Sequence, residues 1–246
     1  MIAWPYRGAL RPWVYGHRGV VSGVPENTLL AFEQALAQGA DGIEFDVQLS
    51  QDGAIVVFHD VSLERMTAGH DNRLIADVSE FDLCRIPLGQ GATIPRFRDV
   101  LTWADPLDVY LNIELKADAF SASTLLAALS REIFNCASDA VKSRLLFSSF
   151  SAEIIDFALE RSWPWPLAQL LGAGKSDQFN VDAVSSCGIH AHLSLMNEVA
   201  LRKCQTRKTF INVWTVNSAQ EAKRLARASI DGIITDEPQL VRGAIE

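Results

Sequence analysis

Short apolar runs alternate along this chain with longer segments in which apolar residues recur every three or four positions. The runs are typical of buried β-strands, and the segments between them are typical of amphipathic helices that cover a sheet. This alternation predicts a parallel sheet with helical connections. The apolar runs cover residues 13–17, 42–49 with a close follower at 54–59, 109–115, 144–150, 167–172, 188–194, 210–216 and 232–236.

Five of the connecting segments have helical spacing. The first of them ends at Gly39, and glycine is a common signal for the C-terminus of a helix. If the follower at 54–59 is a hairpin-like extension of the second strand, eight β/α units remain. This count favours a closed (β/α)₈ TIM barrel over an open doubly wound sheet, which usually has fewer strands and an early glycine-rich phosphate loop. The predicted helices lie within 28–39, 122–134, 151–162, 197–204 and 218–228.

The chain has 246 residues and contains no Ser/Gly/Pro-rich linker or block of charge. A single domain over residues 1–246 is therefore expected, since this is an ordinary size for one α/β barrel. Residues 60–95 depart from the alternation because they are polar and lack sustained periodicity. We interpret this segment as a short excursion after the second strand that passes over the barrel mouth.

Charge and composition narrow the possible partners and the compartment. The formal net charge is −8 and no basic cluster occurs, which argues against nucleic acid or an anionic membrane as a partner. Arg7 and two prolines interrupt the N-terminal segment, and no apolar run is long enough to cross a bilayer. The four cysteines lie far apart and are interpreted as core or incidental thiols. We expect a soluble, cytoplasmic protein; the sequence does not predict its oligomeric state.

Ionisable residues gather at the carboxyl ends of the first predicted strands, where TIM barrels place their functional side chains. Residues two apart on a strand project to the same side, so Glu44 joins Asp46, and Glu114 joins Lys116. Three carboxylates should therefore converge on one mouth. The whole set comprises His17, Arg18, Glu44, Asp46, His59, Glu114 and Lys116.

The three carboxylates, Glu44, Asp46 and Glu114, predict a metal site. Mutually repelling carboxylates in a partly desolvated pocket either bind protons or recruit a cation. Ligation by oxygen alone favours a hard divalent ion, so we expect one Mg²⁺ or Ca²⁺.

The remaining members of the set suit a phosphate ester. His17 and His59 come from different strands, and histidine is the side chain best matched to acid/base work near neutral pH. Arg18 and Lys116 supply two positive hydrogen-bond donors that suit phosphate oxygens.

Each of these residues also fits a structural role when taken alone. A strand-end histidine is often a hydrogen-bonded structural residue, the carboxylates in 42–49 can cap helices or pair with arginines, and Glu114 and Lys116 can form a salt bridge. The catalytic interpretation is favoured because packing gives no reason for seven ionisable residues to fall at the same end of neighbouring strands.

Three further residues have competing or structural interpretations. Trp214 fits both an apolar wall for substrate carbons and a barrel-packing residue. Asn27 precedes a predicted helix and is interpreted as its N-cap. Asp236, near the last strand end, is interpreted as structural.

A set of short motifs follows a fixed order along nearly the whole chain. They are HRG (17–19), PENT (25–28), GIEFDVQLSQDG (42–53), FHD (58–60), ER with a following T (64–67), NIELK (112–116), VWTVN (213–217) and DGIITDEP (231–238). In this ordered set the sequence resembles the glycerophosphodiester phosphodiesterase family. Any one of the motifs alone would be weak support, whereas the ordered combination is specific.

The resemblance implies a (β/α)₈ barrel that uses a divalent metal to hydrolyse glycerophosphodiesters to glycerol 3-phosphate and an alcohol. It also implies that the attacking oxygen can be the substrate's own glycerol hydroxyl, with a cyclic phosphate intermediate, and that the chain is similar to the family's cytoplasmic bacterial members. By motif, the implied roles are an acid/base pair of His17 and His59, metal ligands Glu44, Asp46 and Glu114, and phosphate contacts Arg18 and Lys116.

The sequence departs from the family's pattern in two places. Residues 84–97 form a more compact excursion than is common, and Tyr15 and Gly16 replace a small apolar pair. Two other functions stay open: lysophospholipase D-like cleavage of a bulkier phosphodiester, and phosphodiester binding without catalysis. Head-group preference, the native metal and which histidine acts first as the acid are not predicted.

Overall fold

Eight parallel strands close into a barrel in the computed structural model, which describes residues 11–20, 22–116, 119–174, 188–205 and 209–246. Each strand pairs in parallel with its neighbours, and pairing of the first strand with both the second and the last closes the ring. The predicted TIM barrel is confirmed. Its strands are β1 (Trp13–His17), β2 (Gly42–Leu49), β6 (Tyr110–Leu115), β7 (Leu145–Ser149), β8 (Leu167–Leu171), β9 (Gly188–His192), β10 (Ile211–Trp214) and β11 (Gly232–Thr235).

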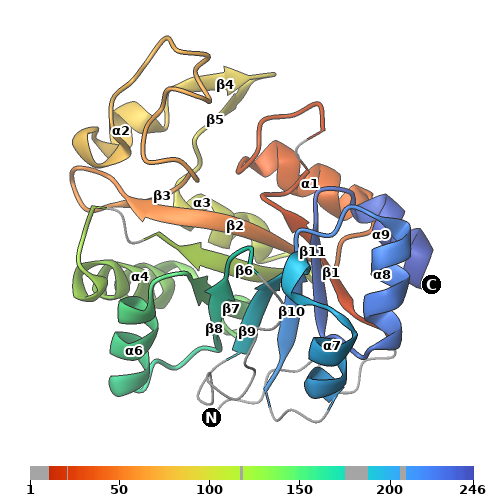
Figure 1. Cartoon of the computed structure of the whole chain (residues 1–246). Coiled ribbons are helices and arrows are strands. Elements are labelled where there is room, and N and C mark those ends of the chain that lie inside the picture. The colour runs from red at the N-terminus through yellow and green to blue at the C-terminus, as the bar shows by residue number, and fades with distance from the viewer. Residues whose placement is uncertain (1–10, 21, 117–118, 175–187, 206–208) are drawn as a thin grey trace.

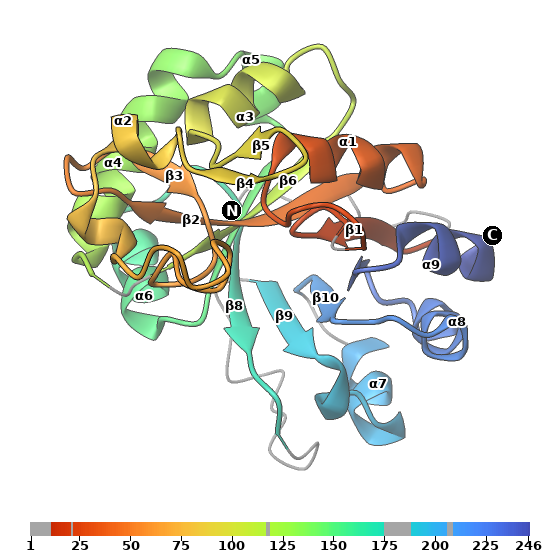
Figure 2. The same ribbon diagram turned by 90° about the horizontal axis from the view of Figure 1, so that it is seen from above.

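Helices surround the strands on the outside, as Figures 1 and 2 show. No helix in the described ranges is both long and apolar enough to cross a bilayer. The helices are α1 (Leu29–Ala37), α3 (Phe97–Ala104), α4 (Ala122–Cys136), α5 (Asp139–Lys142), α6 (Ala152–Glu160), α7 (Glu198–Gln205), α8 (Ala219–Arg227) and α9 (Pro238–Ile245), with a 3₁₀ turn, η4 (Leu193–Leu195), after β9.

Three of these helices, the single turn α5 and the longer α3 and α9, were not predicted. In α3 the buried residues are Phe97, Val100, Leu101 and Ala104, which is the i, i+3, i+4, i+7 spacing of a helix that packs one face on a core. In α9, Pro238 occupies the first turn, where its missing N–H costs no hydrogen bond. Both signals were present in the sequence.

Apolar side chains fill two layers of the barrel. One layer lies between the strands and the helices, where Phe32, Phe45 and Phe147 are fully buried. The other lies inside the ring, where Tyr15, Leu146 and Ile234 pack together. The interior is therefore filled, as is usual for a TIM barrel. We call the end of the barrel at which the strands terminate the mouth; active sites of TIM barrels lie at this end.

Residues 60–95, here called the insertion, stand beyond β2 and β3 (Figure 1). Strand β3 (Ile55–Val57) pairs antiparallel with β2, which confirms the predicted hairpin-like extension. The insertion has more structure than its polarity suggests, because Leu63, Ile75 and Leu83 are fully buried in a separate apolar cluster. Its elements are η1 (Ile75–Asp77), α2 (Glu80–Leu83), β4 (Pro87–Gly89) and β5 (Ala92–Thr93).

Candidate active site

A cavity of about 250 Å³ opens at the mouth, between the ends of the strands. Six of the seven ionisable residues singled out from the sequence line this cavity, and the seventh, Asp46, lies beside two of them in a cluster of carboxylates. The structure thus brings the predicted set together. The six lining residues are His17, Arg18, Glu44, His59, Glu114 and Lys116.

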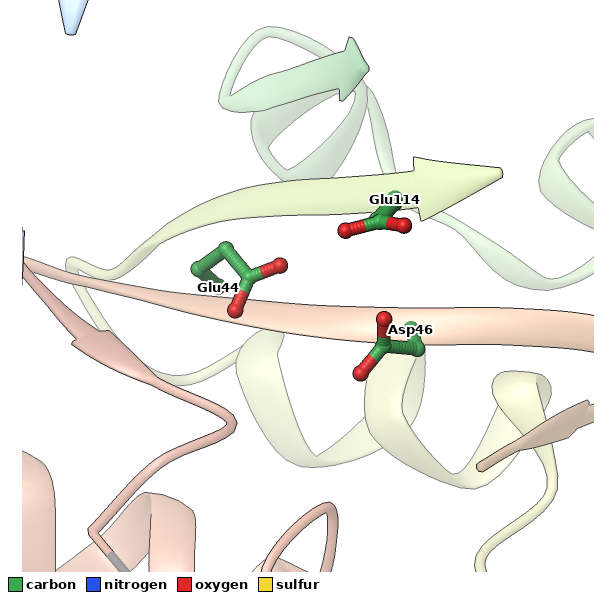
Figure 3. Close-up of side chains that lie close together, drawn as sticks. All are labelled: Glu44, Asp46 and Glu114. Carbon is green, nitrogen blue, oxygen red and sulfur yellow. The ribbon is translucent and has the colours of Figure 1, made fainter. Parts of the chain in front are cut away.

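Strand register explains why these side chains meet. Parallel pairing of β1 with β2 places His17 opposite Glu44, and pairing of β2 with β6 places Asp46 opposite Glu114. Because alternate residues of a strand face the same side, Glu44 and Asp46 both reach the carboxylate that β6 contributes. Figure 3 shows the three carboxylates gathered beside β2 and β6.

The three carboxylates form a donor set that fits a divalent cation. Each offers an oxygen within 4.8 Å of the others, and the exposed fractions are only 5% for Glu44, 1% for Asp46 and 8% for Glu114. Burial and then repulsion by Asp46 raise the pKa of Glu44 to about 8 and also raise the pKa of Glu114. Such an all-oxygen cluster matches the ligands of Mg²⁺ and Ca²⁺, whose positive charge would relieve this repulsion.

Lys116 supplies positive charge within the same cluster. Its Nζ lies 2.9 Å from Asp46 Oδ1 and 2.6 Å from Glu114 Oε1, so Glu114 and Lys116 do form a salt bridge. Burial would raise the pKa of Asp46, but the neighbouring cations, led by Lys116, lower it. Asp46 is therefore the carboxylate most firmly held in its charged form.

Arg18 reaches the cluster because the backbone turns sharply after β1. Its φ is +53°, and its backbone N–H donates to Glu44 Oε2 at 3.1 Å. Gly19 follows at φ +87°, where a Cβ would lie 2.7 Å from the carbonyl carbon of Ala31. Only glycine allows this close approach to α1. The side chain of Arg18 pairs with Glu26 at 2.8 Å.

His17 is held by a carboxylate from the opposite end of the chain. Its Nδ1 lies 2.7 Å from Asp236 Oδ1, and Asn217 Nδ2 donates to Asp236 Oδ2 at 2.6 Å. Burial lowers the pKa of His17, but the hydrogen bond to Asp236 and attraction by Glu44 outweigh burial and raise it. Since Nδ1 donates to the carboxylate, Nε2 is the nitrogen available for proton transfer.

His59 has a similar partner but a different environment. Its Nδ1 lies 2.6 Å from Asp60 Oδ1, and Gln48 Nε2 donates to the carbonyl groups of Phe58 and Asp60, both at 2.9 Å. Burial lowers the pKa of His59, and repulsion by Lys116 adds to it, so that the attraction of the nearby carboxylates does not restore the ordinary value.

An apolar wall and a polar floor complete the cavity. Trp214 packs edge-on against Phe150, with ring centroids 5.5 Å apart, and its Nε1 donates to the His190 carbonyl at 3.1 Å. Below them His190 is fully buried and lies 3.0 Å from Asn212 Nδ2. Burial lowers the pKa of His190 to about 3, so this imidazole is neutral. Trp214 therefore both packs and lines the cavity.

A larger groove of about 610 Å³ adjoins the cavity on the side of His59. The two hollows share His59, Glu114, Lys116 and Phe150 in their linings. Phe150 is 47% exposed and Val61 is 44% exposed, so the groove presents apolar side chains to solvent beside the ionisable cluster.

One interpretation from the sequence, Asn27 as a helix N-cap, is wrong. Thr28, not Asn27, caps α1, because the Thr28 side chain accepts from the Ala31 N–H. Asn27 has φ +56° and donates from Nδ2 to Asp46 Oδ2 at 2.8 Å, so it orients a carboxylate of the cluster. Asp236, interpreted as structural, lies at the mouth and contacts His17 directly; a structural role in support of that imidazole stays a prediction.

Three charged residues around the mouth were given no role from the sequence. Asp60 contacts His59, Glu26 contacts Arg18, and Arg65 contacts both carboxylates. The motifs FHD, PENT and ER with a following T contain these residues. The local sequence pattern does not predict contacts between different motifs.

Comparison with known proteins supports the same family along almost the whole chain. The sequence profile of the Glycerophosphoryl diester phosphodiesterase family matches residues 17–240. An uncharacterized protein of Bacillus subtilis is 30% identical over 92% of this chain and 95% of its own length. A glycerophosphodiester phosphodiesterase of Caldanaerobacter subterraneus is 27% identical over 94% of this chain and 96% of its own.

Solved structures of similar proteins have the same architecture. A phosphodiesterase from Oleispira antarctica, in complex with the product sn-glycerol-3-phosphate, has a TM-score of 0.84 and 27% identity, with 95% of this chain and 96% of that chain covered. A glycerophosphodiester phosphodiesterase from Thermotoga maritima has a TM-score of 0.75 and 29% identity, with 94% and 97% covered.

Proposed function

The chain belongs to the glycerophosphoryl diester phosphodiesterase family, and from this premise we propose that it hydrolyses glycerophosphodiesters to glycerol 3-phosphate and an alcohol. The observation that carries the proposal is one cavity in which a buried carboxylate cluster is flanked by His17 and His59. The product bound to the Oleispira antarctica relative is glycerol 3-phosphate, which supports the same substrate class here.

We propose that Glu44, Asp46 and Glu114 hold one divalent ion, Mg²⁺ or Ca²⁺. When bound, this ion supplies positive charge that draws the phosphate to the mouth and offsets the charge of the transition state. Fixed donors at the places where charge develops are among the largest contributions to catalysis. Arg18 and Lys116 line the same cavity as the carboxylate cluster. We propose that they contact the non-bridging phosphate oxygens.

The two imidazoles are proposed to move the protons. One histidine accepts the proton of the attacking oxygen while the other gives a proton to the departing alcohol oxygen. Neither oxygen then has to carry a full charge during the reaction. Two attacking oxygens fit this arrangement, a water molecule and the adjacent glycerol hydroxyl. The second gives a cyclic phosphate, which water then opens to glycerol 3-phosphate and which phosphorus NMR detects during the reaction.

The two hollows offer room for the two halves of the substrate. We propose that the substrate spans both of them, with one half against Trp214 in the 250 Å³ cavity and the other half along the groove beside His59. An in-line displacement needs the entering and departing oxygens on opposite sides of phosphorus, and the two hollows meet at the shared lining of His59 and Lys116.

A second candidate function is lysophospholipase D-like cleavage of a bulkier phosphodiester. The observation that favours it is the groove, whose exposed Phe150 and Val61 can cover an acyl chain. Phe150→Ala should then raise the KM for lysophosphatidylcholine more than the KM for glycerophosphocholine. Phe134→Ala, on α4 and 71% exposed, is the matched control and should change neither value.

The deciding experiment is a product assay with the purified chain. Glycerophosphocholine, glycerophosphoethanolamine and lysophosphatidylcholine are incubated with Mg²⁺, Ca²⁺ or chelator. Glycerol 3-phosphate is measured against free glycerol for the first two substrates, and lysophosphatidic acid and choline are measured for the third. Glycerol 3-phosphate release from the first two substrates is expected. Preference for lysophosphatidylcholine would favour the second candidate. Binding of all three diesters without turnover would replace both with a non-catalytic binding protein.

A further inference from the structure

One arginine of the insertion bridges two carboxylates that belong to different parts of the mouth. Arg65 Nε lies 2.5 Å from Asp60 Oδ2, and Nη2 lies 3.0 Å from Asp60 Oδ1. The same guanidinium reaches Glu26, with Nη2 2.6 Å from Oε1 and Nη1 3.1 Å from Oε2. We call these three side chains the Arg65 bridge. Four hydrogen bonds from one planar fork fix both carboxylates in direction as well as position.

Each carboxylate of the Arg65 bridge holds a side chain that lines the cavity. Asp60 Oδ1 accepts from His59 Nδ1 at 2.6 Å, and Glu26 Oε1 accepts from Arg18 Nη1 at 2.8 Å. A continuous chain of contacts therefore runs from His59 to Arg18 by way of Arg65. Within it, Asp60 is the first residue of the insertion and Arg65 lies further inside it; Arg65 touches neither His59 nor Arg18 in these contacts.

The turn that carries Arg65 is itself well supported. Thr67 Oγ1 donates to the Leu63 carbonyl and accepts from the Asp71 N–H, both at 3.0 Å. Leu63 is fully buried in the apolar cluster of the insertion. The guanidinium is thus presented from a fixed backbone although its side chain is 50% exposed.

Charge explains what the bridge does. Asp60 and Glu26 side chains are only 22% and 13% exposed, so two carboxylates would repel one another with little water to screen them. Burial by itself raises both pKa values. The hydrogen bonds and positive charges of the neighbouring side chains, led by the hydrogen bond from Arg65, together outweigh burial, lowering the pKa of Asp60 to about 2 and lowering that of Glu26. Both therefore stay charged, and each stays oriented toward its partner.

We propose that Arg65 is a positioning residue, which holds Asp60 against His59 and Glu26 against Arg18 and so makes the two sides of the mouth depend on the insertion. The proposal rests on the proposed function for the roles of His59 and Arg18, but its geometry does not. It gives a role to the Glu-Arg-x-Thr motif, which the catalytic assignment leaves unused.

The first test compares Arg65→Gln with Arg73→Gln. Arg73 is a matched control because it lies in the same insertion, is 52% exposed and binds Asp71 at 2.6 Å. Arg65→Gln should lower kcat/KM on glycerophosphocholine about ten- to a hundredfold, the size expected for lost charge-assisted hydrogen bonds. Misplacement of His59, which is proposed to transfer a proton, should lower kcat. Misplacement of Arg18, which is proposed to bind phosphate, should raise KM. Arg73→Gln should leave both near the parent values.

Arg65→Lys separates charge from geometry. Lysine keeps the positive charge but cannot bind two carboxylates through a planar fork, so it should recover part of the kcat/KM lost in Arg65→Gln. A full loss in both variants, with the same fall in melting temperature, would mean that Arg65 only stabilises the fold.

A double-mutant cycle tests whether Arg65 acts through Asp60. In an Asp60→Asn background, Arg65→Gln should add little further loss of kcat, because the bridge to His59 is already broken. Independent losses that multiply in full would overturn the proposal.

A measurement without substrate separates this proposal from the proposed function. In protein with ¹⁵N-labelled histidine, Arg65→Gln should shift the ring-nitrogen signals of His59 and leave those of His17, and Arg73→Gln should shift neither. Unchanged His59 signals would overturn the positioning role even in an active enzyme. Shifted signals in a chain that hydrolyses no glycerophosphodiester would keep it and reject the proposed function.

Discussion

The two histidines of the mouth have unlike supports. His17 ends β1, and its partner Asp236 follows β11, so its support comes from the strand ends of the barrel itself. The group behind Asp236 is the neutral amide of Asn217. His59 follows β3, and the group behind its partner Asp60 is the charged guanidinium of Arg65, which comes from the insertion.

The two environments also shift the pKa values of the two histidines in opposite directions. The pKa of His17 is raised, because Asp236 and Glu44 together outweigh the effect of burial. The pKa of His59 is lowered, because burial and the positive charge of Lys116 outweigh its carboxylate neighbours. Divergent pKa values in one pocket are the usual basis for separating a general acid from a general base.

Metal removal should have the largest effect on activity. The carboxylate cluster belongs to the cavity that both His17 and His59 line, so loss of the ion would affect the steps of both histidines. Chelation is expected to abolish hydrolysis of glycerophosphocholine, and added Mg²⁺ or Ca²⁺ should restore it. Calorimetry should detect binding of the ion to the parent chain and a much weaker signal for Asp46→Asn. A metal-free preparation that works at full rate would contradict the site.

Removal of either imidazole comes next. His17→Ala and His59→Ala should each lower kcat by about 10²- to 10⁴-fold, the range typical of acid/base groups, with a melting temperature near that of the parent. His70→Ala, an exposed histidine of the insertion, is the control and should keep its activity. Near-normal turnover in one of the two variants would remove that histidine from the mechanism.

Smaller losses are expected when the supports are weakened rather than the imidazoles. Asp236→Asn and Asp60→Asn each replace a charged acceptor by a neutral amide, which removes about 1.5–3 kcal/mol of charge-assisted hydrogen bonding. This corresponds to about a ten- to hundredfold fall in kcat. Asp71→Asn, which alters a carboxylate paired with Arg73, is the matched control. Equal activity of all three variants would show that the supports do not matter.

The smallest effect is a shift of the pH profile, which distinguishes the two sides. Activity should rise with pH as His59 loses its proton, below the ordinary histidine pKa, and fall again as His17 loses its proton, above it. Asp236 raises the pKa of His17, so Asp236→Asn should move only the alkaline limb to lower pH. Asp60 raises the pKa of His59, so Asp60→Asn should move only the acid limb, also to lower pH. A plot of kcat/KM against pH checks both; movement of both limbs together would contradict separate supports.

Strand periodicity was enough to predict much of this molecule. Each strand of the barrel is a short apolar run, and residues two apart on a strand must face the same side. That rule alone placed Glu44 beside Asp46, and Glu114 beside Lys116, as the structure has them. The helices α3 and α9 were not predicted, although the sequence contains a signal for each: helical spacing of apolar residues in α3 and Pro238 at the start of α9.

The contacts that hold the histidines depend on the path of the chain in space. His17 and Asp236 are 219 positions apart, and Glu26 and Arg65 are 39 apart. Asn27 took the left-handed backbone conformation and turned to Asp46 instead of capping α1. Local pattern reports only the face on which a side chain lies within its own element. Which residues then meet across loops depends on barrel closure and on how the insertion packs, so the sequence determined the ring of strands and its carboxylates, and the tertiary structure alone decided what holds each imidazole.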